Sequence, residues 1–347
     1  MMKFKAFLTL LCGGIWMLSS CIKENNDNVG TNIQYSEKQV GILCEGNYMW
    51  NNARFDVYSI DSQRYYANVF EAVNKVPLGD VLQSGCYSGN YIWLCVNNTG
   101  KIVALDRKTM KIVKSRGGLK SPRYILPIGP VLLVSDLQNN AVSVLDSGSL
   151  KTIYEYKVLA GTLPSNRSGW TEQLVSWNNE VVVSCYDGYL MYLNLQLQKV
   201  NKIEADTGCQ NLVVDARNRL WVLSSVNGKA SLVAYTTDKK ESKRIVFPAG
   251  SSISRLCVSP NSSQLYFIFQ NKVCRLSIDA QDLSEIDVVF DGAQTCYGLG
   301  VDQRTGQIYV ADAKDYVSNG IMTILNDKKE VIQSYPTGII PSGFVFF

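Results

Sequence analysis

The hydrophobic positions of this chain fall in short alternating runs that come in pairs separated by a polar turn. The clearest pair is Tyr91–Asp106, in which apolar residues alternate on both sides of Asn97-Asn98-Thr99-Gly100. Alternation with a period of two predicts strands, and Asn and Gly accept the positive φ of a tight turn. Similar pairs recur at Val40–Asp61, Val131–Asp146, Glu180–Asn194, Arg219–Thr236, Gln264–Asp279 and Gln307–Asn326.

The spacing of these pairs predicts a β-propeller. The equivalent positions are Leu94, Val134, Val183, Val222, Phe267 and Val310, and the steps between them are 40, 49, 39, 45 and 43 residues. A period of about 40–45 residues with several short strands per repeat is typical of propeller blades. The copy around Leu43 makes seven blades, so we expect an all-β, seven-bladed propeller.

The two ends of the propeller are expected to meet. The last apolar segment, Pro341–Phe346, supplies the inner strand that the first blade lacks at its own start. Pairing of this segment with Val40–Cys44 would close the ring and hide the strand edges that an open sheet exposes. The propeller is therefore expected to occupy residues 38–347.

The first 37 residues are expected to lie outside this fold. Residues 1–20 have a basic start followed by a short apolar run, as a secretory signal does. The run ends in Leu18-Ser19-Ser20-Cys21, which resembles a bacterial lipobox, so Cys21 is expected to carry the lipid. The alternative is an ordinary secretory signal with an accidental cysteine. Residues 21–37 are polar and are expected to form a flexible tether to the membrane.

The charge balance does not favour a nucleic-acid partner. The chain has 34 basic and 30 acidic residues, a net charge of +4. Removal of residues 1–20 takes away Lys3 and Lys5, which leaves +2 (32 basic minus 30 acidic residues). A charge so small and so evenly spread does not indicate a polyanion-binding surface.

Several segments resemble a known family. Glu45-Gly46-Asn47, Leu78-Gly79-Asp80, Ser121-Pro122-Arg123-Tyr124 and Ala311–Tyr316 are similar to segments of the YncE-like surface propeller lipoproteins of Bacteroidetes. This group includes the BtuG-type cobalamin-capture proteins. The resemblance implies display at the outer membrane over a TonB-dependent transporter. Relatives of this kind accompany transporters for different cargoes, so the resemblance does not fix the ligand.

A propeller brings the turns between second and third strands, and the starts of the inner strands, to one face around its channel. Aromatic rings mixed with amides and a few charges at these positions suit a large, flat, amphipathic ligand. Asn and Asp are also common turn formers, and rings also fill spaces between blades. The candidate ligand-binding residues are Tyr48, Trp50, Asn51, Asn98, Arg123, Asp136, Trp170, Tyr186, Tyr297, Asp312, Lys314 and Tyr316.

Other chemistry is disfavoured. The chain contains no histidine, which excludes Ser-His-Asp and Cys-His catalysis and imidazole–metal sites. The ten cysteines form no Cys-x-x-Cys pair, and those of the blades fall at positions for small buried residues. Asp136, Asp187, Asp312 and Asp315 could form a calcium or acid–base site, although Asp after a strand is more often a turn residue. We expect no cofactor and no enzymatic activity.

Three functions are compatible with the sequence. The first is a lipid-anchored surface protein that captures a nutrient, with cobalamin or a related corrinoid as the best guess, and delivers it to a TonB-dependent transporter. The second is a propeller that serves as a platform for protein–protein interaction without a small ligand. The third is an enzyme that uses carboxylates of the channel face. Without a histidine, a bound corrinoid would be recognised by its ring periphery and side-chain amides.

Overall fold

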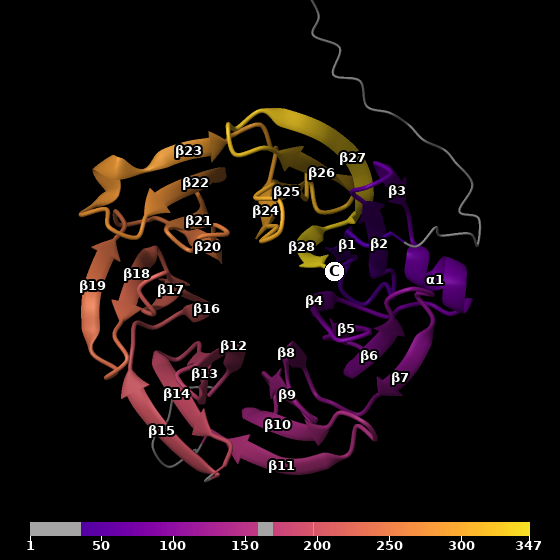
Figure 1. Cartoon of the computed structure of the whole chain (residues 1–347), viewed down its shortest axis with the longest axis horizontal. Helices are drawn as coiled ribbons and strands as arrows, with labels where there is room; N and C mark the ends of the chain where they lie inside the picture. The colour runs from indigo at the N-terminus through magenta and orange to yellow at the C-terminus, as the bar shows by residue number, and fades with distance from the viewer. Residues whose placement is uncertain (1–35, 159–168, 197) are drawn as a thin grey trace, which may run out of the picture.

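Seven four-stranded antiparallel sheets surround a central channel in the computed structural model, which describes residues 36–158, 169–196 and 198–347 (Figure 1). The seven-bladed propeller expected from the repeats is confirmed. From the channel outward, blade 1 consists of β28 (Pro341–Phe346), β1 (Gln39–Cys44), β2 (Arg54–Ser59) and β3 (Arg64–Tyr66), and blade 2 of β4 (Leu82–Ser88), β5 (Tyr91–Val96), β6 (Lys101–Asp106) and β7 (Ile112–Arg116). Blade 3 consists of β8 (Pro122–Ile128), β9 (Val131–Asp136), β10 (Ala141–Asp146) and β11 (Thr152–Lys157), and blade 4 of β12 (Thr171–Trp177), β13 (Glu180–Cys185), β14 (Tyr189–Asn194) and β15 (Lys199–Glu204).

Blades 5 to 7 complete the ring in the same strand order. Blade 5 consists of β16 (Cys209–Val214), β17 (Leu220–Val226), β18 (Lys229–Tyr235) and β19 (Glu241–Val246). Blade 6 consists of β20 (Ile253–Val258), β21 (Gln264–Phe269), β22 (Lys272–Ser277) and β23 (Asp287–Phe290), and blade 7 of β24 (Cys296–Val301), β25 (Ile308–Asp312), β26 (Asn319–Leu325) and β27 (Val331–Ile339). A 3₁₀ turn, η2 (Leu283–Glu285), precedes β23.

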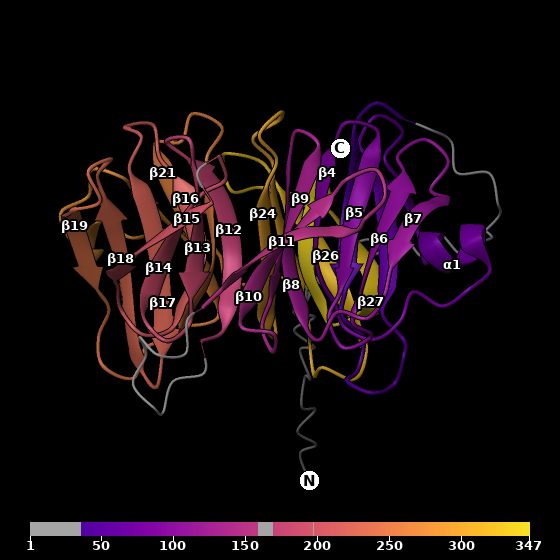
Figure 2. The same cartoon turned by 90° about the horizontal axis from the view of Figure 1, so that it is seen from below.

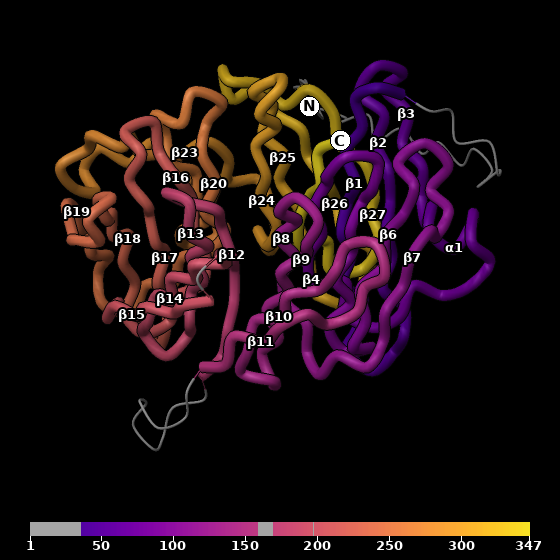
Figure 3. The backbone as a smooth tube through the Cα atoms, turned by 60° about the horizontal axis from the view of Figure 1, so that its bottom comes forward, coloured from indigo at the N-terminus to yellow at the C-terminus, as the bar shows by residue number. Residues whose placement is uncertain are grey.

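The ring closes as the sequence predicts, between its first and last segments (Figure 3). Strand β28 pairs antiparallel with β1, with Val40 opposite Phe346 and Ile42 opposite Phe344. Val345 of β28 is buried among residues of blades 1 and 2. The last segment therefore joins neighbouring blades and pairs with the inner edge of β1, which would otherwise be exposed.

The core lies between neighbouring blades. The seven second-strand positions that define the repeat are all buried, and alternate residues of each second strand face the blade before and the blade after it. Trp221 and Phe267, for example, pack in one cluster shared by blades 5 and 6. Each blade thus needs both neighbours to bury its two faces, which is the physical basis of the repeat.

One element was not expected from the repeats. Helix α1 (Val69–Asn74) follows the short strand β3 on the outside of blade 1 and buries Val69 and Phe70 in the core between blades 1 and 2. The carboxylate of Asp56 holds the surrounding segment: it accepts hydrogen bonds from the Tyr65 hydroxyl (2.5 Å) and the Asn68 amide N–H (2.6 Å). No helix among the described residues is long and apolar enough to cross a membrane.

The two faces of the ring differ in what they carry (Figure 2). We call the face with the β1–β2 loop, the other turns between second and third strands, and the starts of the inner strands the mouth face. The C-terminal end of β28 and Ser36, which binds Asp61 in the β2–β3 turn (2.6 Å), lie on the opposite face. The described chain therefore begins on the face away from the candidate ligand-binding residues.

Candidate functional site

Every inner strand carries a β-bulge near its start, and the bulges set up the site. The register shifts at Leu82/Ser84, Pro122/Tyr124, Thr171/Leu174, Cys209/Asn211, Ser254/Cys257 and Cys296/Gly298, and where β28 meets β1. A bulge inserts an unpaired residue and re-aims its side chain. The residues left unpaired include Gln83, Arg123, Glu172, Gln210, Arg255, Tyr297 and Ser342.

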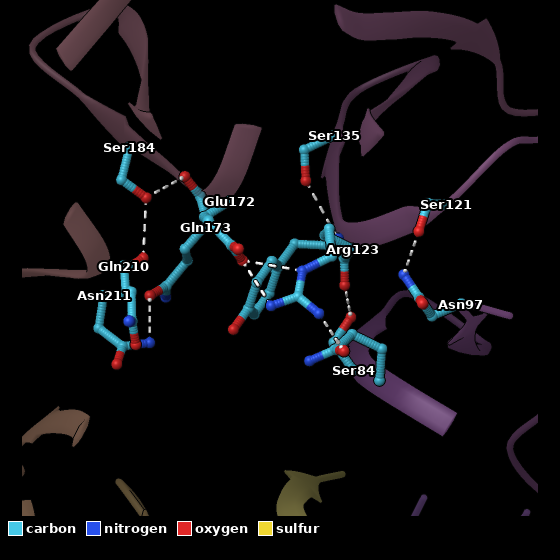
Figure 4. Close-up of polar contacts among 12 residues, drawn as sticks. Ser84, Asn97, Ser121, Arg123, Ser135, Glu172, Gln173, Ser184, Gln210 and Asn211 are labelled. Carbon is cyan, nitrogen blue, oxygen red and sulfur yellow. Dashed lines mark hydrogen bonds and ion pairs between the residues drawn. The ribbon is translucent and has the colours of Figure 1, made fainter. Parts of the chain in front are cut away.

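Buried serines replace ladder hydrogen bonds that the bulges remove (Figure 4). The Ser84 hydroxyl donates to the Arg123 carbonyl (2.6 Å), and the Ser184 hydroxyl donates to the Gln210 carbonyl (2.8 Å). The Tyr124 N–H donates to the Ser135 hydroxyl (3.1 Å). Since an unpaired buried backbone group costs about 1–3 kcal/mol, these hydroxyls fix the bulges in place.

The bulge residues line a polar cavity of 380 Å³ at the mouth end of the channel. All seven blades contribute to its wall. The lining residues are Glu45, Gln83, Arg123, Tyr124, Glu172, Gln210, Asn211, Ser254, Arg255 and Tyr297. Two arginines and two glutamates make the cavity charged but formally neutral. We call this set of residues the channel ring.

One arginine–glutamate pair of the channel ring is closed. Nε and Nη2 of Arg123 each lie 2.8 Å from Oε2 of Glu172 (Figure 4). Arg123 also donates to the side-chain oxygen of Gln83. A buried charge needs a partner, and the contacts of Arg123 with Glu172 and Gln83 provide it. They hold β4, β8 and β12 together and leave Arg123 little capacity for a ligand.

The second pair is open. Nη2 of Arg255 lies 3.9 Å from Oε1 of Glu45, beyond hydrogen-bonding distance. Arg255 is held by a hydrogen bond from its Nε to the Tyr297 carbonyl (2.9 Å) and lies over the Tyr297 ring, 5.1 Å from its centroid. The Tyr297 hydroxyl in turn donates to Glu45 (3.3 Å).

The backbone of Arg255 is also unusual. Its φ is +61°, a conformation that costs a residue with a side chain of this size about 1–2 kcal/mol. Its N–H donates to the Asn211 side-chain oxygen (3.1 Å), which supports this geometry. Such local strain clusters at functional sites.

Burial perturbs the acids of the channel ring. Loss of solvent raises the pKa of the Glu45 carboxyl, and Arg255 opposes the rise. Burial raises the pKa of Glu172 in the same way against Arg123. Burial also raises the pKa of Tyr297, to about 12, so its hydroxyl stays protonated and is a hydrogen-bond donor.

The channel ring opens into a groove of 530 Å³ over blades 6 and 7. The groove shares Ser254 and Tyr297 with the channel cavity and continues to Tyr316. The rings of Tyr297 and Tyr316 stand at 90° with centroids 5.6 Å apart, so one wall is aromatic. The other lining residues are mostly small, hydroxyl-bearing or amide-bearing: Pro248, Ala249, Gly250, Ser251, Ser252, Ile268, Gln270, Asn271, Thr295 and Cys296.

The predicted residues of the first and last blades come together beside this groove. The Asn47 side-chain amide donates to the Tyr316 carbonyl (2.8 Å), which joins the β1–β2 loop to the β25–β26 loop. Tyr48 and Trp50 are 67% and 75% exposed, and Tyr316 is 44% exposed, so their rings are available to a ligand. We call these three residues the first aromatic cluster.

A second aromatic pair lies on blade 4, across the seven-membered ring from the junction of blades 1 and 7 (Figure 1). The ring centroids of Trp170 and Tyr186 are 5.9 Å apart, and Trp170 is 40% exposed. Both residues belong to loops of the mouth face. The channel ring thus lies between two aromatic clusters, and both clusters consist of predicted residues.

Three of the predicted polar residues hold loops of the mouth face. Asp136 accepts backbone N–H groups of Lys120 and Ser121 (both 2.9 Å), and Asp312 accepts that of Thr295 (2.8 Å). Asn98 donates to the carboxylate of Asp80 (2.5 Å), which also accepts the Met49 N–H.

Asn51 and Lys314 both have positive φ, Asn51 in the β1–β2 loop and Lys314 in the turn after β25. Lys314, with Asp312, lines a separate cavity of 450 Å³ between blades 6 and 7. At both positions the residue therefore shapes the backbone of its loop, as turn-forming residues do.

The sequence predicted Arg123 and Tyr297 of the channel ring but missed the other eight residues: Glu45, Gln83, Tyr124, Glu172, Gln210, Asn211, Ser254 and Arg255. A signal was present: a polar residue recurs beside the start of each otherwise apolar inner strand. This polar residue indicates a channel position only if a bulge is present, because in a regular strand the same residue would lie between blades.

Other candidate sites are weaker. The described ranges contain no group of three or more His, Cys, Asp or Glu side chains able to hold a metal ion. A cavity of 580 Å³ on blade 5 includes Asp206 and Arg244, but these two already form an ion pair (2.5 Å). All eight cysteines within the described ranges are free thiols.

Comparison with known proteins supports the fold. No protein-family model matches the chain, and no curated protein matches it in sequence. A quinonprotein alcohol dehydrogenase-like protein from Bacteroides thetaiotaomicron is similar in structure, with a TM-score of 0.68 at 13% identity over 88% of this chain and 78% of that one. A 6-phosphogluconolactonase-like protein from Bacteroides uniformis gives 0.66 at 11% identity over 90% of this chain and 100% of that one. Its counterpart from Bacteroides fragilis gives 0.65 at 10% identity over 89% and 98%.

Proposed function

We propose that this propeller is a binding protein that captures an amphipathic small molecule on its mouth face. The observation that carries the proposal is the channel ring flanked by two exposed aromatic clusters. Rings offer contact area at low entropic cost, and the polar cavity between them orients the ligand. The cavity of 380 Å³ holds a substituent, while the body of the ligand lies across the mouth.

A corrinoid is the best candidate for this ligand. It is large and flat, with apolar ring faces and polar amide side chains around its edge. These features match rings at the periphery and hydrogen-bonding groups in the channel. With no histidine in the chain, the corrinoid would be recognised through its periphery and not through its cobalt.

The proposed setting is the outer surface of the outer membrane, beside a TonB-dependent transporter that receives the ligand. The lipobox-like segment at Cys21 and the family resemblance support this proposal, and residues 1–35 lie outside the described residues. The start of the described chain at Ser36, on the face away from the channel ring, is compatible with a tether that leaves the mouth face open. Protease treatment of intact cells tests the display: the propeller should be accessible without breaking the cells.

The binding experiment uses isothermal titration of the purified protein with cyanocobalamin. We expect binding, and we expect Trp50→Ala to weaken it at least tenfold, about 1.4 kcal/mol, through loss of an exposed ring. Ile153→Ala is the control, because Ile153 is 58% exposed on the outer strand β11. Absence of binding well above micromolar ligand would overturn the corrinoid assignment.

One observation favours protein docking as a second candidate. Met49 (76% exposed) and Val317 (70%) extend the first aromatic cluster into an exposed apolar patch. If the propeller acts only as a platform, Trp50→Ala should weaken association with its protein partner, while cyanocobalamin produces no titration heat.

Acid–base catalysis is supported less well. Glu45 and Glu172 have raised pKa values in a cavity, as catalytic acids often do. Glu172, however, is held by Arg123, and Glu45 accepts a tyrosine hydroxyl beside Arg255. Two similar structures carry the name 6-phosphogluconolactonase, so turnover of 6-phosphogluconolactone by this protein would reverse the preference.

A further inference from the structure

The channel ring contains two arginine–glutamate pairs, one closed and one open, and this difference points to a ligand group. Arg123 and Glu172 are in direct contact at 2.8 Å, whereas Arg255 and Glu45 are 3.9 Å apart. The side chains are comparably covered, with 23% and 7% exposure for the closed pair and 22% and 14% for the open pair. Solvent exposure therefore does not explain why one pair stays apart.

Neighbouring groups hold the open pair apart. The Nε of Arg255 is engaged by the Tyr297 carbonyl, and its guanidinium lies over the Tyr297 ring. Glu45 begins the loop after β1, where its N–H donates to the Ile340 carbonyl (2.9 Å). The positive φ of Arg255 fixes the direction of its side chain. Both charged groups line the cavity. The Glu45 carboxylate also accepts hydrogen bonds from Tyr297 and Ser342, but its two oxygens offer about four acceptor sites, so it keeps capacity for a further donor.

We propose that the open Arg255–Glu45 pair is a specificity-determining subsite for a primary carboxamide of the ligand. The carboxamide oxygen accepts from Arg255, and its NH₂ group donates to Glu45. An amide oxygen and nitrogen lie about 2.3 Å apart, as the C=O and C–N bond lengths require. Such a group can lie alongside donor and acceptor atoms separated by 3.9 Å and bond to each.

A carboxylate of the same shape fits poorly. It would satisfy Arg255, but its second oxygen would meet the Glu45 carboxylate, and two like charges in a desolvated cavity repel. The subsite therefore distinguishes an amide from the corresponding acid, which differ by one atom. This inference rests on the proposed function, because it names a group of the captured molecule.

The first test uses a matched pair of small probes, benzamide and benzoate. Their titrations are followed by NMR at the Arg255 Nε–H and the Tyr297 ring. We expect the intact protein to bind benzamide at least tenfold more tightly than benzoate. Glu45→Gln should reverse this order, because it removes the acceptor charge and leaves Arg255 unbalanced. Arg255→Gln should weaken both probes, and benzoate the more, because the Glu45 charge then repels the carboxylate with no arginine beside it.

The controls separate the subsite from general effects. Glu180→Gln breaks another partly buried ion pair, with Lys239 (2.7 Å), outside the channel ring, and should leave both titrations unchanged. Thermal melting verifies that each variant folds. If Glu45→Gln does not fold, Tyr297→Phe replaces it as the test variant, because this change only removes the hydroxyl that donates to Glu45. Equal binding of benzamide and benzoate by the folded protein would overturn the proposal, as would displacement of benzamide by methyl glucoside at equal concentration.

The same variants tested with cyanocobalamin separate the two proposals. If benzamide is selected but cyanocobalamin does not bind, the corrinoid assignment fails and the carboxamide subsite stands. If cyanocobalamin binds and neither Glu45→Gln nor Arg255→Gln weakens it by tenfold, the subsite fails and the capture function stands.

Discussion

Several polar residues of the mouth face bind the backbone of neighbouring loops through their side chains. Asp136 and Asp312 are the last residues of strands β9 and β25, and their oxygens accept backbone N–H groups of the loops that lead into inner strands. Asp80 does the same for the loop that carries Met49. Asp80 and Asp312 thus hold the loops that carry the aromatic residues proposed to contact a ligand.

Replacement of Asp136 by alanine tests this role. Asp136 is 2% exposed and accepts N–H groups of Lys120, Ser121 and Asn139. Loss of the carboxylate leaves these donors unpaired, so the free energy of unfolding should fall by at least about 2 kcal/mol. Urea denaturation measures the change, with the exposed Asp327→Ala as the control, expected within about 0.5 kcal/mol of the parent. Unchanged stability with weaker binding of cyanocobalamin would instead assign Asp136 to the ligand.

At the level of elements, the inner strands perform two functions at once. Their apolar residues pack between blades, while the bulge near each start turns a polar side chain into the channel. The last of them, β28, also closes the ring, with Val345 against Gly85 of the neighbouring blade. A Cβ at Gly85 would lie 2.8 Å from Val345 Cγ2, so this contact requires a glycine.

The closing strand is expected to be as important for stability as a core strand. Val345→Ala removes two methyl groups from a side chain that is 3% exposed and should lower the free energy of unfolding by about 2 kcal/mol. The same change at Val113, 46% exposed on the outer strand β7, should have little effect. Equal effects in urea denaturation would show that β28 frays from β1.

For the whole molecule, stability comes from the ring of packed blades, with no disulfide between the described residues. The eight thiols are buried or half-buried, and none is paired with another. Burial raises the pKa of Cys86 and of Cys257 to about 12, so neither is a thiolate at neutral pH. These cysteines are packing residues, as their strand positions predict.

Thiol chemistry provides a global test. In the folded protein these eight cysteines should react slowly with Ellman's reagent, and all should react in denaturant. The melting temperature should be the same with and without dithiothreitol. A melting temperature that falls by several degrees in dithiothreitol would reveal a disulfide that contributes to stability.

The architecture of this protein follows from its pattern of apolar residues alone. Alternation of apolar residues fixes each strand, and the recurrence of strand pairs fixes seven blades, because each blade must present the same two buried faces to its neighbours. The closing segment Pro341–Phe346 was also predictable, since an apolar strand without a partner needs an edge. The aromatic positions of the mouth face follow from where turns fall in the repeat.

The chemistry of the channel and the helix on the outside of blade 1 depend on tertiary contacts. A bulge shifts register by one residue, and alternation of apolar residues does not determine whether Gln83 or Arg255 then points between blades or into the channel. Helix α1 forms because Val69 and Phe70 find a core beside blade 2. Glu45 meets Arg255 and Tyr297, more than 200 residues later, only when the ring closes. The repeat is a local property of the chain, whereas the site depends on contacts between blades that are distant in sequence.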